Sequence, residues 1–162
     1  MFQTLVHPTD FDEPSKEAFR VARSLAQALG ARLVVVHVVP PPAIVAQDGR
    51  VILDPHNPEP IDPWVEYRKL QAGDEPKVPI RYAVVVGDRA ESVRLLDAKI
   101  RELGEGALVV MGTHGRSGVS RLLWGSKAEE AVRHCPCPVL VVKAPAPKSP
   151  AGDPEADVAA SA

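Results

Sequence analysis

The sequence predicts an α/β fold with an open, mostly parallel five-stranded sheet and helices on both faces, in a Rossmann-like three-layer arrangement. Apolar, β-branched runs alternate along the chain with segments of helical periodicity, which is the order of elements in α/β proteins. The run Leu33–Val39 is apolar almost throughout, as is typical of a parallel strand that is covered on both faces. The crossovers between such strands are expected to be right-handed.

Residues 2–39 form the first predicted strand–helix–strand unit. Phe2–His7 is a short apolar strand that we expect the stretch Pro8–Asp10 to end. Asp12 suits the N-cap of the following helix, which tolerates Pro14 in its first turn, and Gly30 suits its C-terminal end. The apolar positions of this helix are Ala18, Phe19, Ala22, Leu25, Ala26 and Leu29.

Residues 40–63 interrupt the alternation, because seven of these 24 residues are proline. We expect an extended insertion loop with a short strand-like piece at Val51–Leu53. A short helix is predicted over Trp64–Gln71, with Trp64, Val65 and Leu70 as its apolar positions.

The second half of the chain contains three more predicted strands, at Ile80–Val86, Ala107–Met111 and Val139–Val142. After the first of them, Asp88 and Glu91 fit a capping pair for a helix that ends at Gly104. The apolar face of that helix comprises Val93, Leu96, Ile100 and Leu103. A last helix is predicted to open at Ser126 and to carry Ala128, Ala131, Val132 and Cys135.

The composition predicts one domain, residues 1–143, followed by a disordered tail over residues 144–162 that is rich in Ala, Pro, Ser and acidic residues. A net charge of −2 gives no electrostatic reason to expect binding to nucleic acid or to an anionic membrane. The sequence has neither a membrane-length apolar run nor a charged leader. Cys135 and Cys137 are too close together to form a disulfide framework, so we expect a cytoplasmic protein.

The candidate binding segment follows the fourth predicted strand, where Gly112, Gly115 and Gly125-Ser126 have the spacing G-x2-G-x9-G-S. Glycines permit positive φ angles and let a phosphate approach the backbone closely. Free N–H groups at the start of a helix, together with the positive end of the helix dipole, attract anions. Arg116 and Lys127 add positive charge nearby.

Ligands of open α/β sheets bind at the carboxyl ends of strands, where the strand order reverses. The loops at Asp10 and Gly112 both leave such ends, so they flank one crevice if the first and fourth strands are neighbours. The Ser126 hydroxyl can bond either a ligand or its own helix, in a capping box with Glu129.

Other reactive side chains have alternative interpretations. His114 is either a general base or a hydrogen-bonding spacer, and no Ser–His–Asp set accompanies it. His7 and His37 fit satisfied core residues better than metal ligands. Cys135 and Cys137 fit inert structural thiols, because zinc requires more ligands at suitable spacing.

Several segments resemble the universal stress protein family over about residues 2–143. They are His7–Phe11, Val36–Val39, Val86–Asp88, Met111–Gly115 with Gly125-Ser126, and Cys137–Val142. The long glycine motif is the most specific of them, and it resembles the ATP-binding branch of that family.

The resemblance implies a sheet order of 3-2-1-4-5 and a homodimer through the strand Val139–Val142. It places Asp10 against adenosine, the main chain of Val38 at adenine, Gly112 under the ribose, and Gly115, Gly125 and Ser126 at the phosphates. Mg²⁺ or Mn²⁺ would be held by the phosphates of ATP. The implied ligand contacts are Pro8, Thr9, Asp10, Val38, Met111, Gly112, Thr113, His114, Gly115, Arg116, Ser117, Gly125, Ser126, Lys127 and Ala128.

The chain departs from the family pattern in its Pro-rich loop, in the short second helix and at Lys127, where an apolar residue is common. That lysine either strengthens phosphate binding or points to solvent. The hypothesis that follows is an ATP-binding, non-enzymatic stress-response regulator. The alternatives are a slow ATPase or self-phosphorylating enzyme that uses His114 or Ser126, and a ligand-free dimeric interaction module.

Overall fold

The computed structural model describes residues 1–41, 44–45, 51–52, 64–65, 67–68, 78–113 and 126–144. Within these residues, parallel strands form a five-stranded sheet in the order β5-β2-β1-β6-β7. This is the predicted 3-2-1-4-5 order, with β1 and β6 as neighbours. The strands are β1 (Thr4–Thr9), β2 (Arg32–Val39), β5 (Ile80–Val86), β6 (Ala107–Thr113) and β7 (Val139–Lys143).

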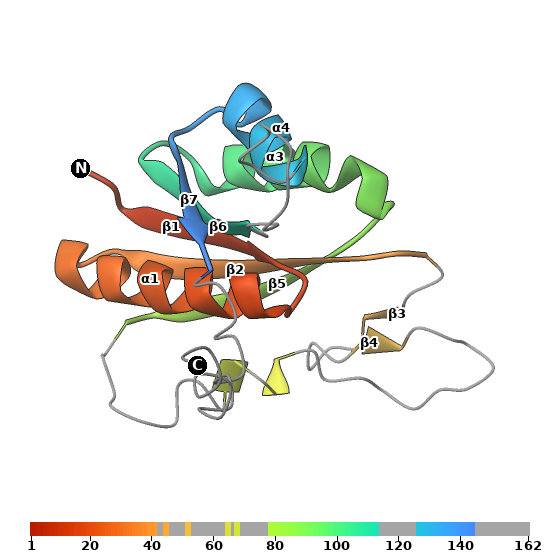
Figure 1. The fold of residues 1–162 in the computed structure, drawn as a ribbon, viewed down its shortest axis with the longest axis horizontal. Helices are drawn as coiled ribbons and strands as arrows, with labels where there is room; N and C mark the ends of the chain where they lie inside the picture. Colours follow the sequence, from red (N-terminus) through yellow and green to blue (C-terminus); the bar gives the residue numbers. More distant parts are fainter. Residues whose placement is uncertain are drawn as a thin grey trace, which may run out of the picture.

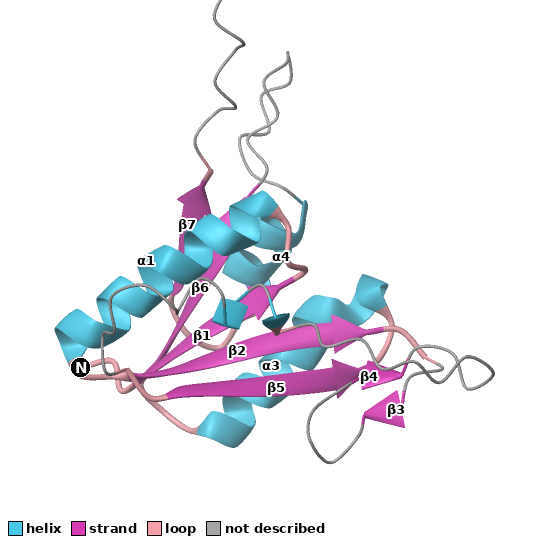
Figure 2. Ribbon diagram, turned by 90° about the horizontal axis from the view of Figure 1, so that it is seen from below, coloured by secondary structure: helices cyan, strands magenta, loops and turns pink. Residues whose placement is uncertain are grey.

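Helices cover both faces of the sheet, which confirms the predicted three layers (Figure 1). Helix α1 (Glu13–Leu29) lies on one face, and α3 (Ser92–Leu103) and α4 (Ser126–His134) lie on the other. Figure 2 shows α1 on the near side of the sheet, alongside β1 and β6, with α3 behind β2 and β5.

The ends of α1 follow the prediction. The Ser15 N–H donates to Asp12 Oδ1 at 2.7 Å, which makes Asp12 the N-cap, and Pro14 lies in the first turn. Gly30 adopts a left-handed conformation with φ 62° and closes the helix. The buried apolar face of α1 consists mainly of Ala18, Phe19, Ala22 and Ala26.

Strand β1 covers Thr4–Thr9, so it begins two residues after the predicted start at Phe2 and ends two residues after the predicted end at His7, within the stretch Pro8–Asp10. Pro8 lies opposite Val36 of β2, whereas the pairing of β1 with β6 stops at Val6. Because β1 has no β6 partner at Pro8, the missing proline N–H removes no ladder bond on that side.

Strand β6 also runs two residues beyond its predicted end at Met111. Gly112 and Thr113 pair with Val142 and Lys143 of β7, so the glycine lies inside the strand. The partner strand therefore extends β6 past a residue type that usually weakens strands.

The turn before α3 differs in detail from the predicted capping pair. Asp88 Oδ1 accepts from the Ala90 N–H at 2.8 Å and caps the 3-10 turn η1 (Arg89–Glu91). The carboxylate of Glu91 instead lies 3.6 Å from Arg94 Nη1, and it makes no cap bond for α3. The predicted apolar face of α3 is confirmed, with Val93, Leu96 and Ile100 buried.

Helix α4 begins at Ser126 as predicted and buries Ala128 and Ala131. Cys135, which was predicted to lie on this helix, instead follows its last residue, His134. Val132 belongs to the helix as predicted but is 49% exposed. It follows Ala131 directly, and adjacent helical residues point about 100° apart around the axis.

The proline-rich connection is described in part. Ile44–Val45 (β3) and Val51–Ile52 (β4) pair as an antiparallel ladder, which confirms a strand at the predicted piece. The Arg68 N–H donates to Trp64 O at 2.9 Å, so one helical turn exists where the short helix was predicted. The rest of the loop, residues 69–77 and the tail beyond residue 144 lie outside the described residues.

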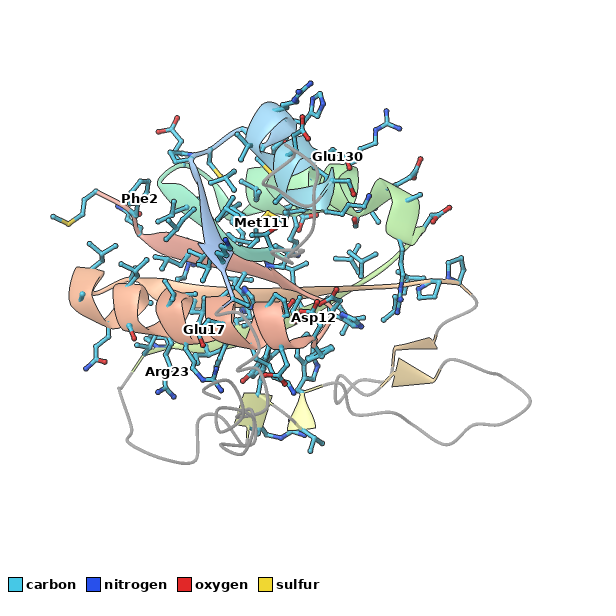
Figure 3. All side chains as sticks on the ribbon, viewed as in Figure 1. Phe2, Asp12, Glu17, Arg23, Met111 and Glu130 are labelled. Atoms are coloured by element: carbon cyan, nitrogen blue, oxygen red, sulfur yellow. The ribbon has the colours of Figure 1, made fainter. Side chains whose placement is uncertain are left out.

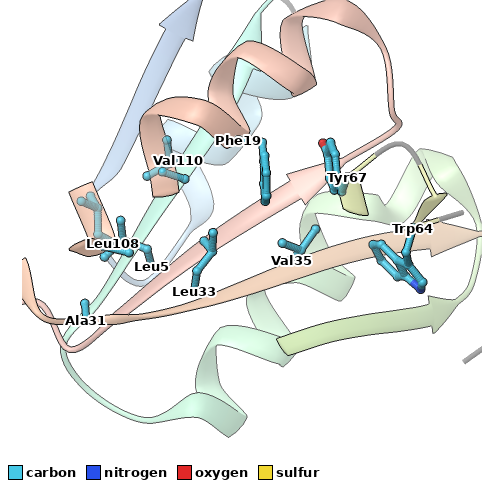
Figure 4. Close-up of a cluster of buried hydrophobic side chains, with 11 residues drawn as sticks. Leu5, Phe19, Ala31, Leu33, Val35, Trp64, Tyr67, Leu108 and Val110 are labelled. Atoms are coloured by element: carbon cyan, nitrogen blue, oxygen red, sulfur yellow. The ribbon is translucent and has the colours of Figure 1, made fainter. Parts of the chain in front are cut away.

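Each face of the sheet has its own core. Beneath α1, Leu5, Leu33, Val35 and Val110 pack with Phe19, Trp64 and Tyr67 (Figure 4). Val6, Val34, Val36 and Val109 pack against α3 and α4 on the other face. The α1-side core also has Phe2, Phe11 and Tyr82 packed against it, so the aromatic residues among those described lie on this side of the sheet.

Candidate functional site

A cleft of about 340 Å³ opens at the carboxyl ends of the strands, between the ends of β1 and β6. Its volume lies within the range of small-molecule sites. The neighbouring positions of β1 and β6 produce the expected crevice. The predicted residues that line it are Pro8, Thr9, Asp10, Val38, Met111, Gly112, Thr113, Ser126, Lys127 and Ala128.

Five other predicted contacts lie outside the described residues. They are His114, Gly115, Arg116, Ser117 and Gly125. The described part of the chain therefore shows the two ends of the glycine segment, Thr113 and Ser126, on the wall of the same cleft.

The cleft has a second wall that the sequence analysis did not include. It comes from β2, from the turn after β5 and from the first turns of α1 and α3. The sheet order could have predicted this wall, because Gly87-Asp88 also follows the carboxyl end of a strand on the same side of the sheet. The additional lining residues are Asp12, Ser15, Val36, His37, Arg89, Ser92, Val93 and Leu96.

Asp10 presents a carboxylate to the cleft from the end of β1. The Ser15 hydroxyl donates to Asp10 Oδ1 at 2.6 Å, and the Asp12 N–H donates to the same oxygen at 3.3 Å. Burial raises the pKa of Asp10, but these hydrogen bonds together outweigh burial, so the pKa lies below its ordinary value. Asp10 is therefore an ionised acceptor at neutral pH.

Gly112 lies where α1 approaches β6 most closely. A Cβ atom at this position would lie 2.5 Å from the carbonyl carbon of Pro14 and 2.9 Å from Ser15 N. Both are backbone atoms of the first turn of α1, which cannot move aside as a side chain can. The packing of α1 on the sheet therefore requires a glycine here, whatever the cleft binds.

The first turn of α4 borders the cleft through Ser126, Lys127 and Ala128. The positive end of a nine-residue helix thus faces the same space as Asp10. Lys127 Nζ donates to Ala90 O at 2.8 Å and lies 3.3 Å from Glu130 Oε2. It therefore joins α4 to the turn after β5, an arrangement that neither sequence-based alternative included.

Figure 3 shows Met111 on the side of the sheet that α3 and α4 cover, and Asp12 on the side that α1 covers. Met111 is buried with the residues packed against α3 and α4, and Asp12 lies at the start of α1. Glu130 lies on α4. The cleft is therefore bounded by helix starts from both layers.

His7 and His37 are both buried and hydrogen-bonded, as expected, and His37 also lines the cleft. His37 Nδ1 donates to Thr9 O at 2.8 Å, and burial lowers the pKa of His37, so the ring is neutral. His7 is fully buried with both ring nitrogens bonded, and burial lowers its pKa to about 4.

Neither thiol has the environment of a reactive cysteine. Cys135 and Cys137 are both free, and burial raises the pKa of each, that of Cys135 to about 11. In the described part of the chain, no three His, Cys, Asp or Glu residues come together as a metal site. No helix among the described residues is long and apolar enough to cross a membrane.

Comparison with known proteins gives one family. The model of the universal stress protein family matches residues 1–143. The Thermus aquaticus "universal stress protein in QAH/OAS sulfhydrylase 3′ region" is 33% identical over 150 residues, covering 88% of this chain and all of that protein. Universal stress protein MJ0531 of Methanocaldococcus jannaschii is 29% identical, covering 90% of this chain and 84% of its own.

Solved structures agree on the fold. Universal stress protein UspA from Lactobacillus plantarum superimposes with a TM-score of 0.62 at 21% identity, covering 87% of this chain and 97% of the other. A universal stress protein in complex with cAMP superimposes with a TM-score of 0.58 at 22% identity, covering 89% and 98%. With the family model matching residues 1–143 and a relative 33% identical along its whole length, the chain belongs to the universal stress protein family.

Proposed function

We propose that this protein is a regulatory nucleotide-binding protein whose cleft takes ATP or a related adenine nucleotide. One observation carries the proposal. An ionised carboxylate, Asp10, and the first turn of α4, at Ser126, line the two sides of a single cleft at the carboxyl ends of β1 and β6. A nucleotide needs this pair of features, an acceptor for its sugar hydroxyls and a positive helix end for its phosphates.

The residues fit the parts of the ligand in order along the sheet. Asp10 accepts hydrogen bonds from the ribose hydroxyls, and the backbone of Val38 borders the base at the end of β2. The N–H groups of Ser126, Lys127 and Ala128 hold phosphate oxygens, and Gly115 and Gly125 let the backbone of the glycine segment approach them. A Mg²⁺ or Mn²⁺ ion is bound through those phosphates.

The choice of an adenine nucleotide has support beyond the geometry. One protein of the same fold has been solved in complex with cAMP. Competition among ATP, AMP and cAMP, each titrated separately, separates the physiological ligand from its relatives.

We propose a binding role and no rapid catalysis. The cleft side chains with acid–base chemistry are already hydrogen-bonded within the protein. Asp10 accepts from Ser15, and Lys127 donates to Ala90. The alternative is a slow ATPase or a self-phosphorylating enzyme. Turnover above about 1 per second would support that alternative, since it is the low end of usual enzyme rates.

Isothermal titration with Mg-ATP tests the proposal. We expect saturable binding by the wild type and none by Gly115→Val, whose side chain blocks the phosphates. Gly152→Val makes the same change in the tail and is expected to bind normally. Normal binding by Gly115→Val would reject the site, and absence of both heat and thermal shift in the wild type would favour a ligand-free interaction module.

The remaining proposals concern assembly and organisation. We propose a cytoplasmic homodimer formed through β7, an edge strand whose Leu140 is 37% exposed. Leu140→Lys is then expected to give a monomer in sedimentation equilibrium. We also propose that residues 1–143 form the nucleotide-binding domain, so truncation after Lys143 leaves the affinity unchanged.

A further inference from the structure

A chain of buried hydrogen bonds joins the helical turn at Trp64 and Tyr67 to the end of β1. His7 Nδ1 lies 2.9 Å from Val110 O, and His7 Nε2 lies 2.9 Å from the Tyr67 hydroxyl. That hydroxyl lies 2.5 Å from Thr9 Oγ1, which in turn accepts from the Phe11 N–H at 2.9 Å. Tyr67 thus links segments that are 60 residues apart in sequence.

The direction of every bond in this chain is fixed by its two ends. Val110 O can only accept, so His7 Nδ1 carries the proton and Nε2 is an acceptor. The Tyr67 hydroxyl must therefore donate to Nε2, and Thr9 Oγ1 must donate to Tyr67. The Phe11 N–H donates into Thr9 Oγ1, so each hydroxyl in the chain both gives and receives one bond.

Phe11 lies at the end of this chain in a backbone conformation that is rare for its type. It is a non-glycine residue of positive φ, at 67°. Such residues persist only where the surroundings hold them. The Phe11 ring lies 4.6 Å from His37, 5.4 Å from Trp64 and 5.2 Å from Tyr67, measured between ring centroids. Its N–H is held by Thr9, so both its backbone and its ring are restrained from the Trp64–Tyr67 side.

Asp10 lies between the two restrained residues, Thr9 and Phe11. Tyr67 is not among the residues that line the cleft, whereas Thr9 and Asp10 are. Its ring stacks on Phe19 of α1 at 4.3 Å with an angle of 8° between the planes, so its hydroxyl is held in place (Figure 4). Tyr67 reaches the cleft through Thr9, to which it is hydrogen-bonded, and through Phe11, whose ring it contacts.

We infer that Tyr67 is a positioning residue of the ligand site, which holds the Thr9–Phe11 turn in the strained shape that presents the Asp10 carboxylate to the cleft. This inference rests on the proposed nucleotide binding. It assigns a function to the helical turn that follows the Pro-rich loop, whose described residues do not line the cleft.

Tyr67→Phe is the first test, because it keeps the stacked ring and removes the hydroxyl. We expect the Kd for Mg-ATP to rise about five- to tenfold, since the turn loses the bond that orders it. Asp10→Asn weakens binding by itself, and the double variant is expected to bind no worse than Asp10→Asn alone. Full additivity of the two losses would overturn the inference.

The stability loss that Tyr67→Phe causes requires a control. Ile100→Val shortens a side chain that is 2% exposed in the opposite core, and it is expected to lower stability without changing the Kd. If Ile100→Val loses as much affinity as Tyr67→Phe, the effect of Tyr67 is only that of lost stability, and the inference is overturned. If Tyr67→Phe does not fold, Thr9→Val breaks the same chain and is expected to accelerate amide exchange of Phe11 in the unliganded protein. Unchanged exchange in that variant would overturn the inference.

A readout without ligand separates this inference from the proposed function. Amide exchange of Phe11 in the unliganded protein is expected to accelerate at least about tenfold in Tyr67→Phe and to stay unchanged in Ile100→Val. Unchanged exchange would overturn the inference even if nucleotide binds. If exchange is faster in Tyr67→Phe but the wild type binds no nucleotide, the role of Tyr67 in holding the turn stands. The proposed nucleotide binding is then rejected.

Discussion

Replacement of Gly112 by alanine tests the packing of α1 on the sheet. The new Cβ would lie 2.5 Å from the carbonyl carbon of Pro14 and 2.9 Å from the backbone nitrogen of Ser15. These atoms belong to the first turn of α1, which the Asp12 cap holds in place. Forcing one extra carbon into such a contact costs about 1–3 kcal/mol of the free energy of unfolding. A chain of this size then loses roughly 2–4 °C of Tm per kcal/mol.

Urea and thermal unfolding without nucleotide measure this loss. Gly87→Ala is the matched control, because its Cβ would meet Leu95 Cδ1 at 2.5 Å, the movable end of a half-buried side chain. We expect Gly87→Ala to change stability by less than half as much. Wild-type stability of Gly112→Ala would refute the close approach of α1 and would leave ligand contact as the reason for the glycine.

Further predictions follow from single groups. Asp12→Ala removes the cap bond to Ser15 N and is expected to lower the free energy of unfolding by about 1 kcal/mol, measured by urea titration; no change would reject the cap. The pKa of His7 is about 4 in the folded protein, whereas the unfolded residue has the ordinary histidine pKa of 6.5, so the unfolded chain binds more protons between these two pH values. Stability should therefore fall as pH drops from 6.5 to 4, by up to about 3 kcal/mol, with His37 adding to the same trend; a flat profile would contradict neutral burial. Cys135 is partly buried and its pKa is raised to about 11, so it should react with a thiol reagent at pH 7.5 more slowly than it does in the unfolded chain, and equal rates would contradict the raised pKa.

The strands that were predicted most accurately are those that form a recognisable run of apolar residues in the sequence. Ile80–Val86 agrees at both ends, and β2 differs from its predicted range by one residue. A parallel strand covered on both faces has apolar residues throughout, so it can be recognised without knowing its neighbours. The caps of α1 were predictable for a similar reason, because Asp12 and Gly30 act through local bonds.

The errors in the ends of β1 and β6 occur where a partner strand determines how far a strand continues. Pro8 and Gly112 are residue types that commonly end strands, yet both lie inside one. Pro8 is tolerated because β6 no longer pairs with β1 there, and Gly112 is held by β7. These facts depend on the sheet register, which local sequence does not contain.

The residues of the candidate site also divide into those that could be predicted from the sequence and those that depend on the arrangement of the strands. The loops at Asp10 and Gly112 were assigned to one crevice because the strand order predicted their proximity. Arg89 and Ser92 were missed, since they line the cleft only through the position of β5 beside β2. The link from Tyr67 to His7 was also missed, because a bond between buried polar groups far apart in sequence leaves no periodic signal.

A crystal structure of the protein grown with ATP and Mg²⁺ tests the central claim most directly. We predict electron density for the nucleotide in the cleft, with the ribose beside Asp10 and the phosphates over the amides at the start of α4. A cleft closed by the protein's own side chains, or a nucleotide bound elsewhere on the chain, would contradict it.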